Sequence, residues 1–169
     1  MWKILSFLIF AFLLSSYSYS EEFFKAKSFE NWDVLITFRD GKVGACHTVS
    51  KPFLDKADGY LTSLLALSYI EDGCFSLSVN LSEDVLFGEV GDVFVHVGKI
   101  KHKLRPKLRG ANTFSSMQDK AILNDIIYES SALEGSLNVE IHMKNGTKTV
   151  DKYQVKKLLD SMIYIEKNC

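Results

Sequence analysis

Apolar and polar residues alternate along most of the chain after residue 20, and this period of two is typical of β-strands. Asp40 and Gly41 separate two such runs, and Asp-Gly in that setting is a strong hairpin signal. Asn145 and Gly146 separate two further runs and predict a hairpin turn of type I′. Glycines between other runs mark additional turns. The predicted strands lie at 29–38, 43–49, 75–81, 85–87, 93–97, 100–104, 137–143 and 147–153.

Three segments depart from clean alternation. Apolar residues recur at helical spacing after Ser116, a residue type that can cap a helix. From Gln154 the chain places Val155, Leu158 and Met162 on one helical face. The segment 60–70 is apolar on both faces and is compatible with a helix or a strand. The turn signal at 71–73 and the alternation after it favour a strand in a second hairpin.

The sum of these elements is a mainly β chain. About eight short strands, two short helices and no regular alternation with long helices predict an antiparallel β-sandwich with helical additions. No repeat, low-complexity stretch or linker divides residues 21–169. We therefore expect one domain, which is long enough to bury a sizeable core.

Residues 1–20 have the pattern of a secretory signal peptide. Lys3 precedes an apolar run from Ile4 to Leu14, and Ser18 and Ser20 supply small residues before a cleavage site. An uncleaved N-terminal anchor is the alternative, but the run is short for a bilayer span of about 20 residues. We expect an exported protein with no membrane span after cleavage.

The net charge and the cysteine content indicate which partners and which disulfides to expect. The formal net charge is −1, so nothing indicates nucleic-acid binding, which requires a basic stripe. Export to an oxidising compartment permits disulfides. Cys46, Cys74 and Cys169 allow one pair with one cysteine left over, or an intermolecular bond.

Two blocks carry a family resemblance. The first reads Phe29-Glu30-Asn31-Trp32-Asp33-Val34, followed by Cys46 and Pro52. The second reads Gly146-Thr147-Lys148-Thr149-Val150-Asp151-Lys152-Tyr153, followed by a helix and Cys169. In order and spacing these blocks resemble the invasion-associated locus B family of exported α-proteobacterial proteins.

The resemblance implies a single immunoglobulin-like β-sandwich in the periplasm or at the outer envelope. It also implies a disulfide between Cys46 and Cys169, the two family-matching cysteines. Cys74 would then be a small buried side chain beside Phe75, or else a link to a second chain. Host-cell invasion is associated with some members of that family.

No residue pattern indicates an enzyme. Gly-x-Ser-x-Gly, Cys-x-x-Cys and glycine-rich phosphate loops are absent from the sequence. The histidines lack metal-ligand spacing, so we expect no metal and no cofactor, although a site assembled by the fold stays open. Asp151 and Tyr153 are expected to be structural, and Trp32 to be a core aromatic rather than a binding platform. The histidines are His47, His96, His102 and His142.

One local charge anomaly is a candidate contact patch. In the strand 100–104 the lysines alternate with apolar residues and would share one exposed face. The simpler interpretation is a solvated face that protects an edge strand. The functional interpretation is a surface for anionic lipid, glycan or an acidic protein. The candidate residues are Lys99, Lys101, Lys103, Arg105, Lys107 and Arg109.

These observations favour an exported, non-enzymatic protein that acts through protein or surface contacts in the envelope. Its partner would be an envelope protein or surface component. A periplasmic small-ligand binding module with a cavity between the sheets is the alternative. A hydrolase with an acid–base pair in a cleft is a third hypothesis.

Overall fold

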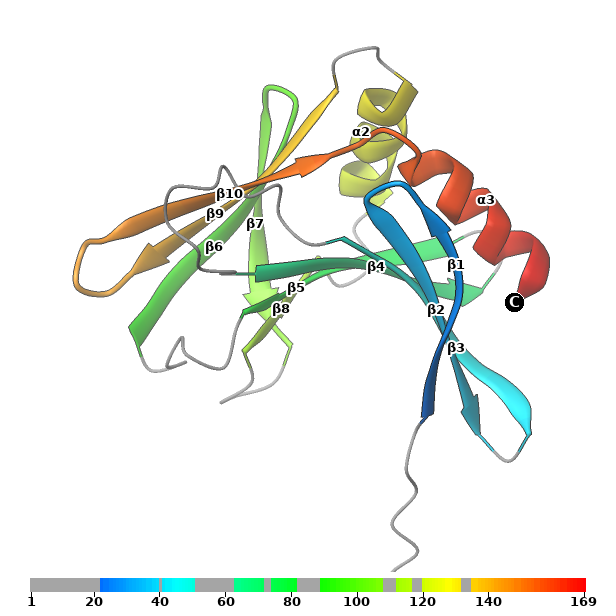
Figure 1. The fold of residues 1–169 in the computed structure, drawn as a ribbon. Coiled ribbons are helices and arrows are strands. Elements are labelled where there is room, and N and C mark those ends of the chain that lie inside the picture. The colour runs from blue at the N-terminus through cyan, green and yellow to red at the C-terminus, as the bar shows by residue number, and fades with distance from the viewer. Residues whose placement is uncertain are drawn as a thin grey trace, which may run out of the picture.

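The computed structural model describes residues 22–39, 41–50, 63–71, 74–81, 89–107, 112–116, 120–131 and 135–169. In this part of the chain, ten strands form one antiparallel sheet that is not closed, and two helices accompany it (Figure 1). The mainly β, antiparallel prediction with two helices is therefore confirmed. The strands are β1 (Glu22–Phe29), β2 (Trp32–Arg39), β3 (Lys42–Ser50), β4 (Ser63–Glu71), β5 (Cys74–Leu81), β6 (Val90–Val97), β7 (Ile100–Pro106), β8 (Thr113–Ser115), β9 (Ser136–Met143) and β10 (Lys148–Gln154), and the helices are α2 (Lys120–Ser131) and α3 (Leu158–Asn168).

The sheet consists of two halves joined by one short strand. The strand order is β1-β2-β3-β4-β5-β8-β7-β6-β9-β10. We call β1–β5 the first half, and β7, β6, β9 and β10 the second half. The strand β8 pairs with β5 around Val79↔Phe114 and with β7 at Arg105↔Ser115 and Pro106↔Phe114. Because so few pairs join the halves, the sheet can bend sharply there, as Figure 1 shows.

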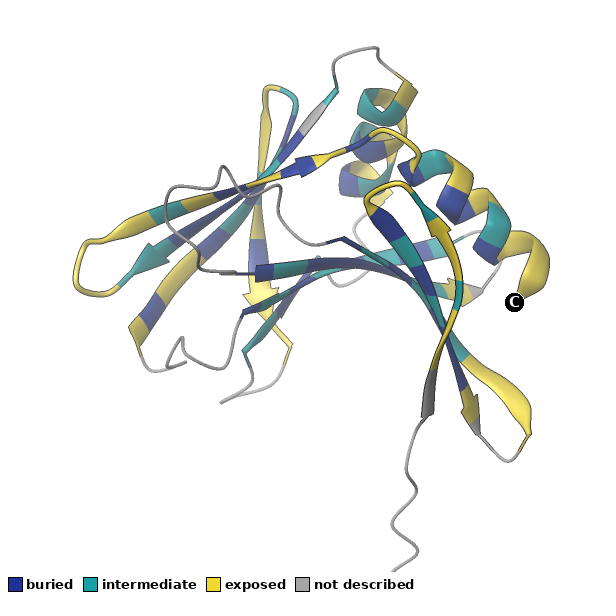
Figure 2. Ribbon diagram, viewed as in Figure 1, coloured by how far each residue is buried: buried dark blue, intermediate teal, exposed yellow. Residues whose placement is uncertain are grey.

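One hydrophobic core serves both halves and both helices (Figure 2). Alternate residues of each strand point into it, such as Leu77 and Val79 on β5 and Val139 on β9. The helix α3 packs on β1, β2 and β3, and α2 contacts β5, β6, β9 and α3. Ile126 of α2 and Leu158 of α3 are fully buried. The amphipathic pattern of both helices is thus explained by packing against the sheet.

Trp32 ties the first half to the end of β10. Its side chain is 0% exposed, and its Nε1–H donates to the carbonyl oxygen of Gln154 at 2.8 Å. The Asn31 side chain also donates to the Gln154 side chain. The expectation that Trp32 is a core aromatic is confirmed.

Several local predictions were wrong or incomplete. The strand β1 was not predicted before residue 29, and a turn at Glu30 and Asn31 separates Phe29 from Trp32. The short strand β8 lies in a segment where no strand was predicted. Residues 63–70 of the ambiguous segment belong to β4, so the strand interpretation is confirmed for its described part. The strand predicted at 85–87 and the signal peptide at 1–20 lie outside the described residues.

The β9–β10 hairpin exists, but its turn is not type I′. That turn needs positive φ at both central residues, whereas only Gly146 has it, at 88°. The N–H of Gly146 donates to Met143 O at 3.0 Å, and Met143 N–H donates to Thr147 O at 2.8 Å. The connection is therefore a longer loop, with the Asn145 side chain accepting from Thr147 N–H at 2.9 Å.

Candidate functional site: a basic face of the sheet

The outward face of the second half carries rows of side chains across four strands. Cross-strand partners in an antiparallel pair lie on the same face. One row runs from Lys101 through His96 and Asn138 to Lys152. The neighbouring row runs from Lys103 through Phe94 and Glu140 to Val150. On this face β7 supplies Arg105 beyond Lys103, and β10 supplies Lys148 opposite His142.

We call this surface the basic face. The opposite side of the same strands faces the core, so the basic face is directed away from it. Its described residues include two carboxylates, Asp92 and Glu140, fewer than its lysines and arginine. Its charge is therefore positive in a chain whose formal charge is −1. The residues that define it are Lys101, Lys103, Arg105, Lys148 and Lys152, with His96 and His142.

Glu140 lies at the centre of the basic face and organises it. Its side chain is only 7% exposed, because the cationic side chains around it cover it. Lys148 Nζ lies 2.8 Å from one carboxylate oxygen, and Lys101 Nζ lies 2.9 Å from the other. His96 Nε2 is 3.0 Å away, and the His142 side chain also contacts the carboxylate. Hydrogen bonds from Lys148, Lys101 and His142 hold the pKa of Glu140 far below its ordinary value, although burial opposes this shift.

An aromatic ring lies beside this network. Phe94 contacts the ring of His142, with centroids 5.3 Å apart. Lys101 Nζ lies 3.9 Å from the Phe94 ring centroid, and Lys103 Nζ lies 5.9 Å from it. Both distances are within the range of cation–π attraction. Val150, directly opposite Glu140 on β10, is 47% exposed. The basic face therefore includes apolar surface, at Phe94 on the inner strand β6 and at Val150 on β10.

The candidate patch is only partly what the sequence predicted. Lys101, Lys103 and Arg105 do share one exposed face of β7. Lys99 lies in the β6–β7 turn, Lys107 follows β7, and Arg109 lies outside the described residues. The strand β7 is not a simple edge strand, since β6 pairs with it along most of its length and β8 pairs with its end.

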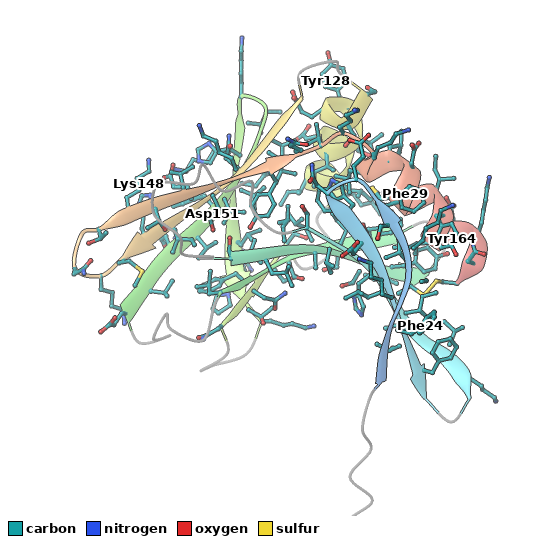
Figure 3. The ribbon with its side chains drawn as sticks, in the orientation of Figure 1. Phe24, Phe29, Tyr128, Lys148, Asp151 and Tyr164 are labelled. Carbon is teal, nitrogen blue, oxygen red and sulfur yellow. A yellow bond between two sulfur atoms is a disulfide. The ribbon has the colours of Figure 1, made fainter. Side chains whose placement is uncertain are left out.

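Lys148 and Lys152 were missed as members of this surface. Their alternation with Thr149, Asp151 and Tyr153 placed them on the outer side of their strand. The sequence could not show that only β6 and β9 lie between β7 and β10 in the sheet. Figure 3 labels Lys148 on β10, with Asp151 further along the same strand.

The depressed pKa of Glu140 predicts a pH-dependent contribution to stability. Because the folded state holds this carboxylate ionised, its contribution is present above the ordinary glutamate pKa of about 4.3 and is lost as the pH falls below it. Glu140→Gln should lower the free energy of unfolding at pH 7 by about 1 kcal/mol, since the lysines are half exposed. Urea unfolding of both proteins from pH 7 to pH 3 measures the difference.

We expect that difference to shrink steadily below about pH 4. The matched control is Glu166→Gln, at an exposed position of α3, which should change stability little at any pH. A difference between the Glu140→Gln protein and the unmodified protein that stays constant with pH would contradict the prediction.

The structure contains the expected disulfide. Cys46 of β3 is bonded to Cys169, with sulfurs 2.07 Å apart, and Cys74 is free. Cys74 is half-buried rather than fully buried, because its side chain points to the opposite side of β5 from its neighbour Phe75. The bond fixes the end of α3 to the first half of the sheet, whereas the basic face belongs to the second half.

Buried polar groups connect the halves inside the core. The Ser63 hydroxyl of β4 donates to the carboxylate of Asp151 on β10, and it lies 2.6 Å from the Tyr153 hydroxyl. All three side chains are buried. Burial raises the pKa of Tyr153 above its ordinary value. Asp151 and Tyr153 thus belong to a buried polar network in the core.

A surface groove of about 850 Å³ lies where β10 leads into α3. Its charged groups include Lys156, 3.1 Å from Glu30, and Lys157, 2.7 Å from Asp160. Val155 and Leu159 add apolar surface. The ligand-module hypothesis expected a cavity between two sheets, and this groove instead lies at the surface beside the start of α3.

Two histidines outside the basic face each contact a single polar side chain rather than a set of metal ligands. His102 lies 2.9 Å from Asp125 of α2, and His47 lies 2.8 Å from the Ser68 hydroxyl. Across the described ranges, no group of three or more His, Cys, Asp or Glu side chains is arranged to hold a metal ion. Within the same ranges, neither helix has the length and apolar character needed to cross a bilayer.

Comparison with protein-family models, curated proteins and solved structures found no match to this chain. The interpretation of the basic face therefore depends on its own geometry and charge.

Proposed function

We propose that this is an exported, non-enzymatic protein of the periplasm or outer envelope that acts by contacting an envelope component. The basic face carries the proposal. It collects cations from two strands that lie far apart in sequence, and it includes apolar surface at Phe94 and Val150. A surface of this kind attracts anionic partners and raises their association rate.

The family resemblance supports the same compartment. An invasion-associated locus B protein would be exported, and the disulfide between Cys46 and Cys169 suits an oxidising compartment. We also propose that the bent sheet is the immunoglobulin-like sandwich that the resemblance implies. The contact of Ser63 with Asp151, one from each half, supports that arrangement.

Photo-crosslinking in the producing cell tests the proposed function. A photoreactive phenylalanine at Val150 lies on the basic face between Lys148 and Lys152 of β10, where the native side chain is 47% exposed. The matched control is the same group at Tyr128 of α2, which is 75% exposed and labelled away from the face in Figure 3. We expect a recurring envelope adduct from position 150 and background from position 128.

The adduct should disappear when Lys103, Arg105 and Lys152 are replaced by serine. If position 150 gives neither a protein adduct nor a lipid adduct above the background from position 128, the proposed function is rejected and a small-ligand module becomes the favoured hypothesis.

A further inference from the structure

We propose that the envelope component bound by the basic face is the phosphate-bearing surface of an anionic phospholipid membrane. This inference rests on the proposed function, because it names the partner of the same surface. The charge, the shape and the apolar residues of the basic face each support this proposal.

The cations are spread over the face rather than gathered at one point. Lys101 and Lys103 lie on β7, whereas Lys148 and Lys152 lie on β10, with β6 and β9 between them. Adjacent strands are about 4.8 Å apart, so the two groups of cations are separated by roughly 14 Å. A broad array of this kind matches a surface of many phosphates better than a single anionic group.

The apolar residues of the face suit the boundary between headgroups and acyl chains. Phe94 lies next to Lys103 in one cross-strand row, and the exposed Val150 ends that row on β10, between Lys148 and Lys152 along the strand. Aromatic and aliphatic side chains framed by lysines are typical of surfaces that lie in a membrane interface. Long lysine side chains can extend to phosphates while the apolar residues lie against the lipid.

The identity of the cations also favours lipid over an acidic protein. Four of the five defining cations are lysines and one is Arg105. A lysine ammonium acts as a point charge, whereas recognition of a specific carboxylate favours the bidentate guanidinium of arginine. Glu140 holds Lys101 and Lys148 in place, so part of this charge is ordered before any partner binds.

The two helices leave the face open. Both α2 and α3 pack through residues that belong to the common core, to which the other side of these strands contributes. A flat surface could therefore approach the outward side of β7, β6, β9 and β10 without displacing either helix.

Vesicle cosedimentation of the mature protein tests the proposal. The probes are vesicles of phosphatidylcholine with and without about one third phosphatidylglycerol. Each lysine or arginine near an anionic bilayer changes the affinity by about fivefold. Replacing Lys103, Arg105 and Lys152 with serine should therefore weaken binding on the order of a hundredfold. None of the three contacts Glu140, so the central network is retained.

The matched control replaces three exposed lysines elsewhere, Lys42, Lys120 and Lys167, with serine. It has the same net charge as the triple variant of the basic face, and we expect it to bind nearly as the unmodified protein does. Thermal unfolding of both variants establishes that each is folded. Binding should also be lost in 1 M salt, where the screening length falls to about 3 Å.

Three results would overturn the membrane proposal. They are no preference for phosphatidylglycerol, equal weakening in both triple variants, or equally tight binding to soluble poly-glutamate. If position 150 nevertheless crosslinks to an envelope protein, the proposed function stands and its partner is that protein. If vesicles and crosslinking both give only background, both proposals fail.

Discussion

Replacing Cys46 and Cys169 together with serine should lower the free energy of unfolding by about 2–4 kcal/mol, and no more than about 5 kcal/mol. The two cysteines are 123 residues apart, so the bond restricts most of the chain described here in its unfolded state. The entropy of closing such a long loop is the main source of the effect, and it acts on the unfolded ensemble. Urea unfolding with and without reductant measures it.

The folded state should survive this change. Leu158, Met162 and Ile165 of α3 remain buried against the core without the disulfide. A buried hydrogen bond of 2.8 Å between Ser161 and Thr48 also joins α3 to β3. Amide exchange should therefore increase in the last turn of α3, next to Cys169, before it increases in β3.

Cys74→Ser is the matched control for the disulfide. Cys74 is free and half-buried, so its replacement should change the unfolding free energy by less than about 1 kcal/mol. It should also leave the reductant-dependent loss of stability unchanged. If reductant does not destabilise the unmodified protein, or if Cys74→Ser removes the effect, the pairing is wrong.

Trp32→Ala should lower the free energy of unfolding by about 3–5 kcal/mol, the range for deletion of a large buried aromatic side chain. The ring is 0% exposed and belongs to the common core. Its N–H also supplies the 2.8 Å hydrogen bond to Gln154 O, at the junction of the first half with the end of β10. The substitution therefore removes packing and a connection between distant parts of the sheet.

Two variants separate these contributions. Trp32→Phe keeps an aromatic ring and removes the N–H donor, so it should lower the free energy of unfolding by about 1–3 kcal/mol. Phe24→Ala removes an aromatic ring that is 60% exposed on β1, and it should cost less than about 1 kcal/mol. Chemical unfolding of the three variants should rank them in this order, and a loss for Phe24→Ala as large as that for Trp32→Ala would contradict the argument.

Local pattern predicted most elements correctly because each depends on a short stretch of chain. The Asp40–Gly41 signal gave the β2–β3 hairpin, and alternation gave the inward side of β5 and β9. Apolar residues at helical spacing predicted the helices α2 and α3. These predictions hold because a strand or helix with one buried face needs the same spacing of apolar residues whatever the rest of the fold is.

Local pattern failed where the partner strand decides the structure. The strand β8 has three residues and exists because β5 and β7 lie on either side of it. Along β1, basic residues and a register shift between Lys25 and Lys27 weaken the alternation, and pairing with β2 defines the strand. At the junction of β1 with α3, Lys27 lies within 5.0 Å of the rings of Phe29 and Tyr164, a contact that depends on the helix position (Figure 3).

The candidate site likewise depends partly on local sequence pattern and partly on the tertiary structure. The sequence by itself determined that Lys101 and Lys103 share one side of a strand, because alternation requires it, whereas Arg105 joins them because β7 extends beyond the predicted strand to Pro106. It also determined that Glu140 and His142 lie on the polar side of β9. Only the tertiary structure decided that β6 and β9 lie between the lysines of β7 and those of β10. Strand order depends on long-range pairing and shared burial, which a local pattern does not encode, and that order makes separate charges into one basic face centred on Glu140.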